Sequence, residues 1–251
     1  MIKYDTRCRR YKNYTLNLFI ISNNPISMSS SLLHFSSITK KIWMALLGIF
    51  LMVFLVVHLG INLCLLRSDG GLWFHEAAHF MGTNYVVKVF EIFLFGGFFI
   101  HIILGIILQV KNWISRPVQY KVSNKSVTPF LSKYMIYTGG IVLIFLIIHF
   151  MNFYFIKLGW AESPVPLLEG GEPDFYQAAI WLFTQPFYSF LYLILMVVLA
   201  FHLNHAFGAA FQTLGLEHKT YTPYIQGFGT IYSIVVPLGY MIIPLYFLIF
   251  S

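Results

Sequence analysis

Five long runs of apolar residues dominate the sequence and constrain its fold more than any other feature. They cover residues 42–66, 89–110, 134–156, 187–214 and 228–250. A helix needs about 20 residues to cross the ~30 Å hydrocarbon core of a membrane, and each run is longer than that. Strands of a transmembrane barrel are about half as long and alternate apolar with polar residues, unlike these runs. We therefore predict an all-α integral membrane protein with five transmembrane helices.

The charges support this class and indicate an orientation. Only 10% of the residues are charged, against about 25% in soluble proteins. The net charge of +7 does not indicate a nucleic-acid partner, because basic and acidic residues are distributed unequally between the loops that join the apolar runs. Residues 111–133 carry five basic and no acidic side chains, whereas residues 157–186 carry one basic and four acidic ones. The positive-inside rule then places the N-terminus and the 111–133 loop in the cytoplasm and the C-terminus outside.

The N-terminal residues 1–27 precede these helices and differ from them. They are basic, and their short apolar patch is interrupted by Asn and Pro. Signal peptides have a longer apolar core and a small-residue cleavage site. We interpret residues 1–27 as a disordered tail or an over-called start, and residues 28–251 as one membrane domain.

Histidines inside the apolar runs are the main functional signal. Polar side chains at membrane depth are costly and usually functional, although any single one can simply hydrogen-bond a neighbouring helix. Each of the first four apolar runs contains at least one histidine, and the fifth run contains none. The five are His58, His101, His149, His202 and His205.

Depth along the helices sorts four of these histidines into two pairs. At 1.5 Å per residue, His58 and His149 lie about 22–24 Å along outbound helices, and His101 and His202 about 21–23 Å along inbound ones. The two levels are roughly 15 Å apart. Facing histidines in a four-helix bundle are a common way to bind a metal cofactor, and haem iron accepts neutral imidazole. We therefore predict a four-helix bundle that binds two haems, plus a fifth helix.

His205 is a candidate for a different role from its neighbour His202. The two side chains project about 60° apart on a helix, so both cannot point at one iron. We expect His202 to be the ligand and His205 to hydrogen-bond a haem propionate.

Two smaller patterns accompany the histidines. FLVVH at 54–58 is echoed as FLIIH at 145–149, and a glycine, Gly48 or Gly139, precedes each histidine by ten residues. Gly97 and Gly105 flank His101 four residues away on either side. Such glycines can clear a helix face for a flat ring, or they can simply allow close helix packing.

HEAAH at residues 75–79 indicates a competing function. It matches the H-E-x-x-H pattern of zinc peptidases, in which His75 and His79 would bind zinc and Glu76 would act as the base. No obvious third ligand follows, and the interpretation leaves the membrane histidines unexplained. A transporter is a third class, and such proteins use broken helices around a site at the membrane midplane. This chain has no Asp, Glu, Lys or Arg inside its apolar runs except near the outer end of the second.

Several segments resemble a known family, the single-chain, five-helix, di-haem cytochrome b subunit of succinate:quinone oxidoreductases (succinate dehydrogenase and fumarate reductase). The segments are SSITKKIWMALLG (36–48), HFMGTN (79–84), NWISRPVQY (112–120) and HLNHAFGAAFQTLGL (202–216). The resemblance implies the same ligand pairs, His58 with His149 and His101 with His202.

The resemblance also implies partners and a location. Dicarboxylate chemistry would lie in separate flavoprotein and iron–sulfur subunits on the basic cytoplasmic face of a bacterial inner membrane. Electrons would reach a membrane quinone, which we expect to be menaquinone, through two b haems in this chain. Glu76 and His79 would lie near the quinone or the haem propionates. Some fumarate-reducing members carry a glutamate where this chain has Ala200, so the direction of the reaction stays open, and another quinone-linked oxidoreductase is the alternative.

Overall fold

The computed structural model describes residues 36–115 and 134–250. The N-terminal segment 1–27 and most of the basic 111–133 loop, about which the sequence made predictions, lie outside the described residues. All further structural statements concern the described part of the chain.

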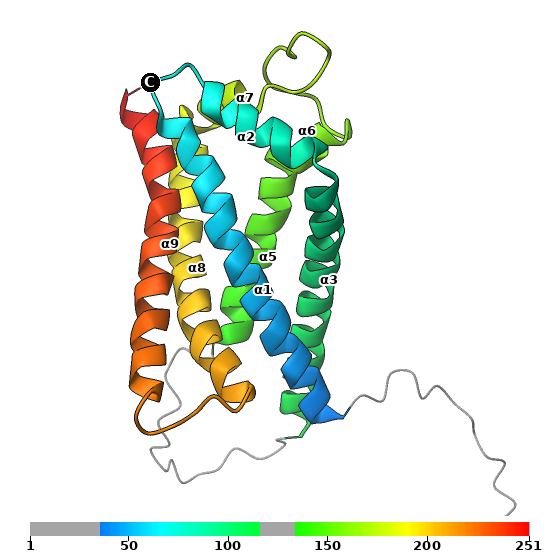
Figure 1. The fold of residues 1–251 in the computed structure, drawn as a ribbon, viewed down its shortest axis with the longest axis vertical. Coiled ribbons are helices and arrows are strands. Elements are labelled where there is room, and N and C mark those ends of the chain that lie inside the picture. Colours follow the sequence, from blue (N-terminus) through cyan, green and yellow to red (C-terminus); the bar gives the residue numbers. More distant parts are fainter. Residues whose placement is uncertain (1–35, 116–133, 251) are drawn as a thin grey trace, which may run out of the picture. The chain divides into compact units, whose positions relative to one another are not determined.

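The described chain folds into helices joined by short loops (Figure 1). In chain order they are α1 (Ser37–Leu63), η2 (Cys64–Leu66), α2 (Leu72–Thr83), α3 (Tyr85–Ile114), α5 (Met135–His149), η3 (Phe150–Tyr154), α6 (Phe155–Lys157), α7 (Phe175–Phe183), α8 (Pro186–Thr213) and α9 (Thr222–Phe250). The η2 segment is a 3₁₀ turn, and η3 is a π-helical segment that continues α5 directly into α6.

Five of these helical stretches are long and apolar enough to cross a membrane, which confirms the predicted fold class. They are Ser37–Leu66, Tyr85–Ile114, Met135–Lys157, Pro186–Thr213 and Thr222–Phe250. The first, second and fifth begin four to six residues before the corresponding apolar runs, and polar side chains cap the first two of these. The Ser36 side chain accepts a hydrogen bond from the Thr39 amide at the start of α1, and the Asn84 side chain accepts from the Val86 amide at the start of α3.

The long helices pack unequally. A third of the central residues of α8 and of α9 is buried, against 6% in α3 and in the α5–α6 span. The α8–α9 contact is the most extensive in the bundle, and α1 packs against α3, α8 and α9. Gly229 of α9 allows a very close approach, because an added Cβ would lie 2.5 Å from Cδ1 of Phe207 on α8.

The short helices α2 and α7 lie across one end of the bundle (Figure 1), which we call the loop end. Phe74 of α2 and several residues of α7 belong to a buried cluster there. Gly71 precedes α2 with φ of +86°, and the Tyr176 ring occupies the position of its missing Cβ. Both helices are therefore anchored to the bundle by apolar contacts.

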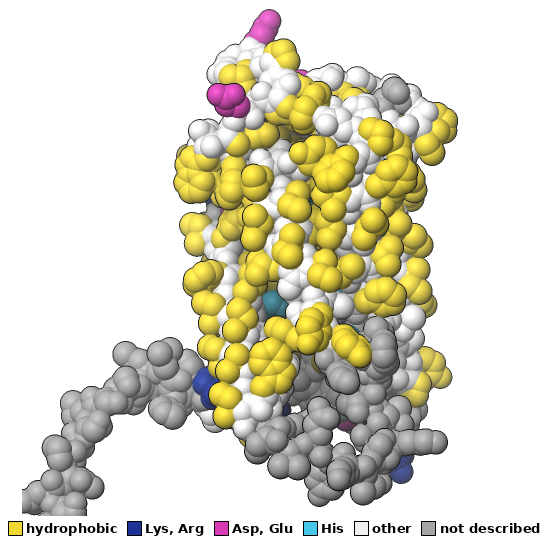
Figure 2. All heavy atoms as spheres, turned by 180° about the vertical axis from the view of Figure 1, so that it is seen from behind, with side chains coloured by type: hydrophobic (Ala, Val, Ile, Leu, Met, Phe, Trp, Pro, Cys, Tyr) yellow, Lys and Arg dark blue, Asp and Glu magenta, His cyan; other side chains and the backbone are white. Residues whose placement is uncertain are grey.

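The opposite end carries Lys40, Lys41 and Lys111 together with the 214–221 loop, and we call it the lysine end. Figure 2 shows hydrophobic side chains across the middle of one face, with the most prominent acidic side chains above and basic ones below. Exposed tryptophans lie near both ends, Trp43 and Trp113 at the lysine end and Trp73 and Trp160 at the loop end. Such aromatic belts mark the two membrane–water interfaces of a spanning protein.

Candidate functional site

His58 of α1 and His149 of α5 lie next to each other, edge to face, near the loop end of the bundle. Their ring centroids are 5.8 Å apart and the ring planes are almost perpendicular, at 83°. Two imidazoles that bind one metal from opposite sides, at about 2 Å each, have ring centres roughly 6 Å apart. The observed separation therefore fits a shared metal centre. We call His58 and His149 the loop-end pair.

Each ring of the loop-end pair is stacked against a phenylalanine one turn earlier on its own helix. Phe54, one turn before His58, stacks on its ring at 5.2 Å and 18°. Phe145 stacks in the same way on His149 at 5.7 Å and 29°. These phenylalanines begin the repeated FLVVH and FLIIH segments, so the repeat corresponds to one local structure that occurs twice. Stacking restricts the rotation of each imidazole.

The polar partners of the loop-end pair are few. The Asn62 side chain donates to the His58 carbonyl at 2.7 Å and lies 3.4 Å from the ring nitrogens. The Nδ1 atom of His149 is buried and has no hydrogen-bond partner among the described residues. A buried ring nitrogen without a partner is uncommon and requires an explanation, such as a ligand or an unseen water.

His101 of α3 and His202 of α8 form a second, wider pair toward the lysine end. The two imidazoles are close enough to repel each other if both were protonated, but no direct ring contact joins them within the described chain. The Nδ1 atom of His101 is buried without a partner. His202 Nδ1 lies 3.4 Å from the hydroxyl of Thr138 on α5, a weak hydrogen bond. We call His101 and His202 the lysine-end pair.

Glycines on the other two helices lie against the lysine-end pair. A Cβ on Gly48 of α1 would be 3.9 Å from Cε1 of His101, and one on Gly139 of α5 would be 3.4 Å from Cε1 of His202. Each glycine precedes a loop-end histidine by ten residues, which is about 15 Å along a helix. Helices α1 and α5 thus supply histidines at one level and clear space for histidines at the other.

The two glycines that flank His101 in sequence have a different role. Gly97 faces Phe50 and Leu47 of α1, and Gly105 faces Met44 of α1. They allow α3 to pack on α1, which is the simpler of the two interpretations from the sequence. The glycines that lie against the imidazoles are instead on neighbouring helices.

The HEAAH segment lies on α2, outside the bundle. Glu76 and His79 are exposed, and His75 Nε2 lies 3.7 Å from Oδ1 of Asp174, the N-cap of α7. In the described ranges no group of three or more His, Cys, Asp or Glu side chains comes together as a metal site. Among the described residues, His75 and His79 therefore have no third metal ligand. His75 of α2 instead lies close to Asp174 at the start of α7.

Sequence reasoning missed two tyrosines that join α9 to α1. The hydroxyls of Tyr232 and Tyr240 donate to the carbonyls of Met52 and Leu55 at 2.6 and 2.7 Å. The Tyr240 ring is also 5.9 Å from the His58 ring. Tyrosines within an apolar helix were the available signal, because a buried hydroxyl requires a partner. The fifth helix, which has no histidine, thus supports the helix that carries His58.

His205 lies one turn beyond His202 toward the lysine end and is half-buried. Its predicted bond to a propionate stays a prediction, as do the quinone contacts of Glu76 and His79. No family model, curated protein or solved structure matches the chain. The fold itself defines a class, an all-α membrane protein with five spans.

Proposed function

We propose that the chain is the membrane-anchor and electron-transfer subunit of a succinate:quinone oxidoreductase, with two b haems. The observation that carries the proposal is the loop-end pair: two histidines from different spans, 5.8 Å apart, with a buried and unpartnered ring nitrogen on His149. The lysine-end pair repeats the unpartnered nitrogen at His101. A haem iron held by two histidines has no open coordination position and supplies one-electron transfer.

Each site would take one histidine from each of two spans of this chain. His58 and His149 would be the axial ligands at one level, and His101 and His202 at the other. Stacking by Phe54 and Phe145 limits the rotation of the loop-end rings. The apolar surroundings exclude water and favour the neutral imidazole that an iron ligand must be.

The partners in this proposal are a flavoprotein subunit and an iron–sulfur subunit, which would carry the dicarboxylate chemistry. Quinone chemistry, with menaquinone as the expected substrate, would take place in this chain. The lysine end would face the cytoplasm of a bacterial inner membrane, because four of the six described lysines lie there and the acidic loop 157–186 lies at the other end.

The decisive experiment is a haem-to-protein ratio on the purified chain, measured as the pyridine haemochrome. We expect two b haems per chain, one after His58→Ala or His149→Ala, and one after His202→Ala. His205→Ala is the matched control one turn away and should retain two. Absence of haem, or one zinc per chain in its place, would reject the proposal and favour the HEAAH alternative.

Two further measurements test the assembly. Succinate added to membranes should reduce the b haems, and failure to do so while both haems are present would indicate a different quinone-linked oxidoreductase. For orientation, single cysteines at Thr220 and Glu169 in a chain lacking Cys8 and Cys64 should react differently with an impermeant label. We expect spheroplasts to label the cysteine at 169 alone, and the reverse pattern would invert the topology.

A further inference from the structure

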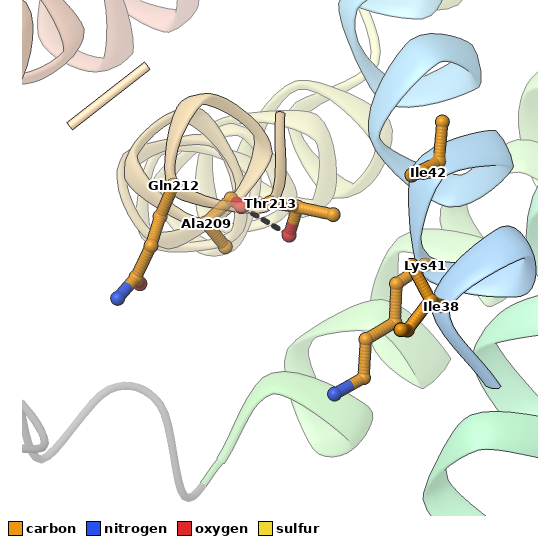
Figure 3. Close-up of a pocket in the computed structure, with 6 residues that line it drawn as sticks. All are labelled: Ile38, Lys41, Ile42, Ala209, Gln212 and Thr213. Atoms are coloured by element: carbon orange, nitrogen blue, oxygen red, sulfur yellow. Dashed lines mark hydrogen bonds between the residues drawn. The ribbon is translucent and has the colours of Figure 1, made fainter. Parts of the chain in front are cut away.

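A groove lies between the start of α1 and the end of α8 at the lysine end (Figure 3). Its volume is about 470 Å³. Its lining consists of Ile38, Lys41 and Ile42 from α1 and Ala209, Gln212 and Thr213 from α8. In Figure 3 the Lys41 chain extends beside Ile38, and Thr213 points from α8 toward α1.

The lining is amphipathic along the helix axes. Ile38, Ile42 and Ala209 provide apolar walls, whereas Lys41 and Gln212 offer hydrogen-bond donors. The Thr213 hydroxyl already donates to the Ala209 carbonyl at 2.7 Å, so it can serve only as an acceptor. The groove thus combines an apolar surface with an ammonium and an amide, which suits a molecule with an anionic head and an apolar tail.

The described charges at this end are unbalanced, with four lysines (Lys40, Lys41, Lys111 and Lys219) against one carboxylate, Glu217. The side chains of Lys40 and Lys111 lie close enough to interact with each other, and Lys41 follows Lys40 on α1. The ion pairs Arg67–Asp69, His75–Asp174 and Lys157–Glu91 all lie toward the loop end. In the described segments, no carboxylate pairs with Lys41. Clustered ammonium groups repel one another, and an anion placed among them relieves that repulsion.

The depth of the groove identifies the source of the anion. Lys41 is only four residues into the first span, which begins at Ser37, or about 6 Å along the axis. Trp43 and Trp113, exposed near the same end, mark the headgroup region. An anion at this depth that also contacts apolar walls is the phosphate of a phospholipid, and basic pockets between spanning helices bind such headgroups.

We propose that this groove binds one anionic phospholipid, with its phosphate on Lys41 and an acyl chain along Ile38, Ile42 and Ala209. The proposal does not depend on haem or on an oxidoreductase partner. It adds a structural lipid that joins the first span to the fourth.

Native mass spectrometry of the full chain, released from vesicles of equal phosphatidylglycerol and phosphatidylcholine, tests the proposal. We expect one phosphatidylglycerol to be retained in preference to phosphatidylcholine. Lys41→Gln should lower that retention about fivefold, and Lys41→Arg should preserve it. Lys219→Gln, which removes a lysine from the loop at the same end but outside the groove, is the matched control and should retain the lipid.

A second variant tests the contribution of the apolar wall of the groove independently of the lysine charge. Ala209→Phe keeps every lysine but fills the apolar wall, and we expect it to lose the retained lipid as well. Equal retention of both lipids, or equal loss in Lys41→Gln and Lys219→Gln, would overturn the proposal. Displacement of the lipid by millimolar inorganic phosphate would also overturn it, because the site would then be one for soluble anions.

Discussion

The contact between Gly229 of α9 and Phe207 of α8 permits a quantitative test of how the bundle is held together. Gly229→Ala would place a Cβ at 2.5 Å from Cδ1 and 2.8 Å from Cγ of Phe207. These atoms are at the base of the ring, and Phe207 is buried and stacked on Phe211 at 4.8 Å. The ring therefore cannot swing away, and the two helices have to separate. Gly227, two residues earlier on α9, has no atom of the described residues within 4 Å of an added Cβ.

The two glycines form a matched pair. Replacing a helical glycine by alanine contributes up to about 1 kcal/mol of helix propensity at either position, so that contribution cancels in the comparison. Overpacking a filled core costs about 1–3 kcal/mol, and only Gly229→Ala incurs it. We expect Gly229→Ala to be less stable than Gly227→Ala by about 1–3 kcal/mol.

Unfolding in detergent micelles, followed by circular dichroism, measures this difference. A Gly229→Ala protein as stable as the Gly227→Ala protein would refute the reasoning. A double variant identifies the contact. If the Phe207 ring is the obstacle, Phe207→Leu should cost less in the Gly229→Ala background than alone, a non-additivity expected of residues in contact.

Two further predictions concern the histidine pairs. Tyr240→Phe removes the hydrogen bond to the Leu55 carbonyl and should lower the unfolding free energy by about 0.5–1.5 kcal/mol, measured in the same micelles; an unchanged value would show that the bond contributes nothing. Gly139→Leu should fill the space beside His202 and reduce bound haem to one per chain by the haemochrome assay, whereas Gly140→Leu, where an added Cβ meets no atom within 4 Å, should retain two. Equal haem content in both variants would remove the glycine from the site.

The sequence predicted the number of spans because long apolar runs have few alternatives. The predicted starts of α1 and α3 were several residues too late in the chain. Hydropathy does not detect polar N-caps such as Ser36 and Asn84, which begin a helix in the membrane interface. The repeated FLVVH and FLIIH segments contained the phenylalanine–histidine stacks, but only the fold shows that each phenylalanine contacts its own histidine.

Features that depend on neighbouring helices could not be predicted. The π-helical segment after His149 leaves no mark in an apolar run, although such segments are frequent at functional sites. Gly139 acquires its significance from His202, 63 positions away in the chain and on another helix. Spacing within one helix directed attention to Gly97 and Gly105, whereas the contacts across helices involve other glycines.

The uneven packing of the long helices has a consequence for the order in which the protein assembles. Membrane helices insert first and associate afterwards. Because α8 and α9 are joined by the short 214–221 loop and bury a third of their central residues, they can associate as a hairpin without the other spans. Helix α3 contacts mainly α1 and α2, so His101 reaches its final position only after α1 has docked. If α3 docks late, the lysine-end pair closes late, and we expect a molecule held between His101 and His202 to enter before α3 docks.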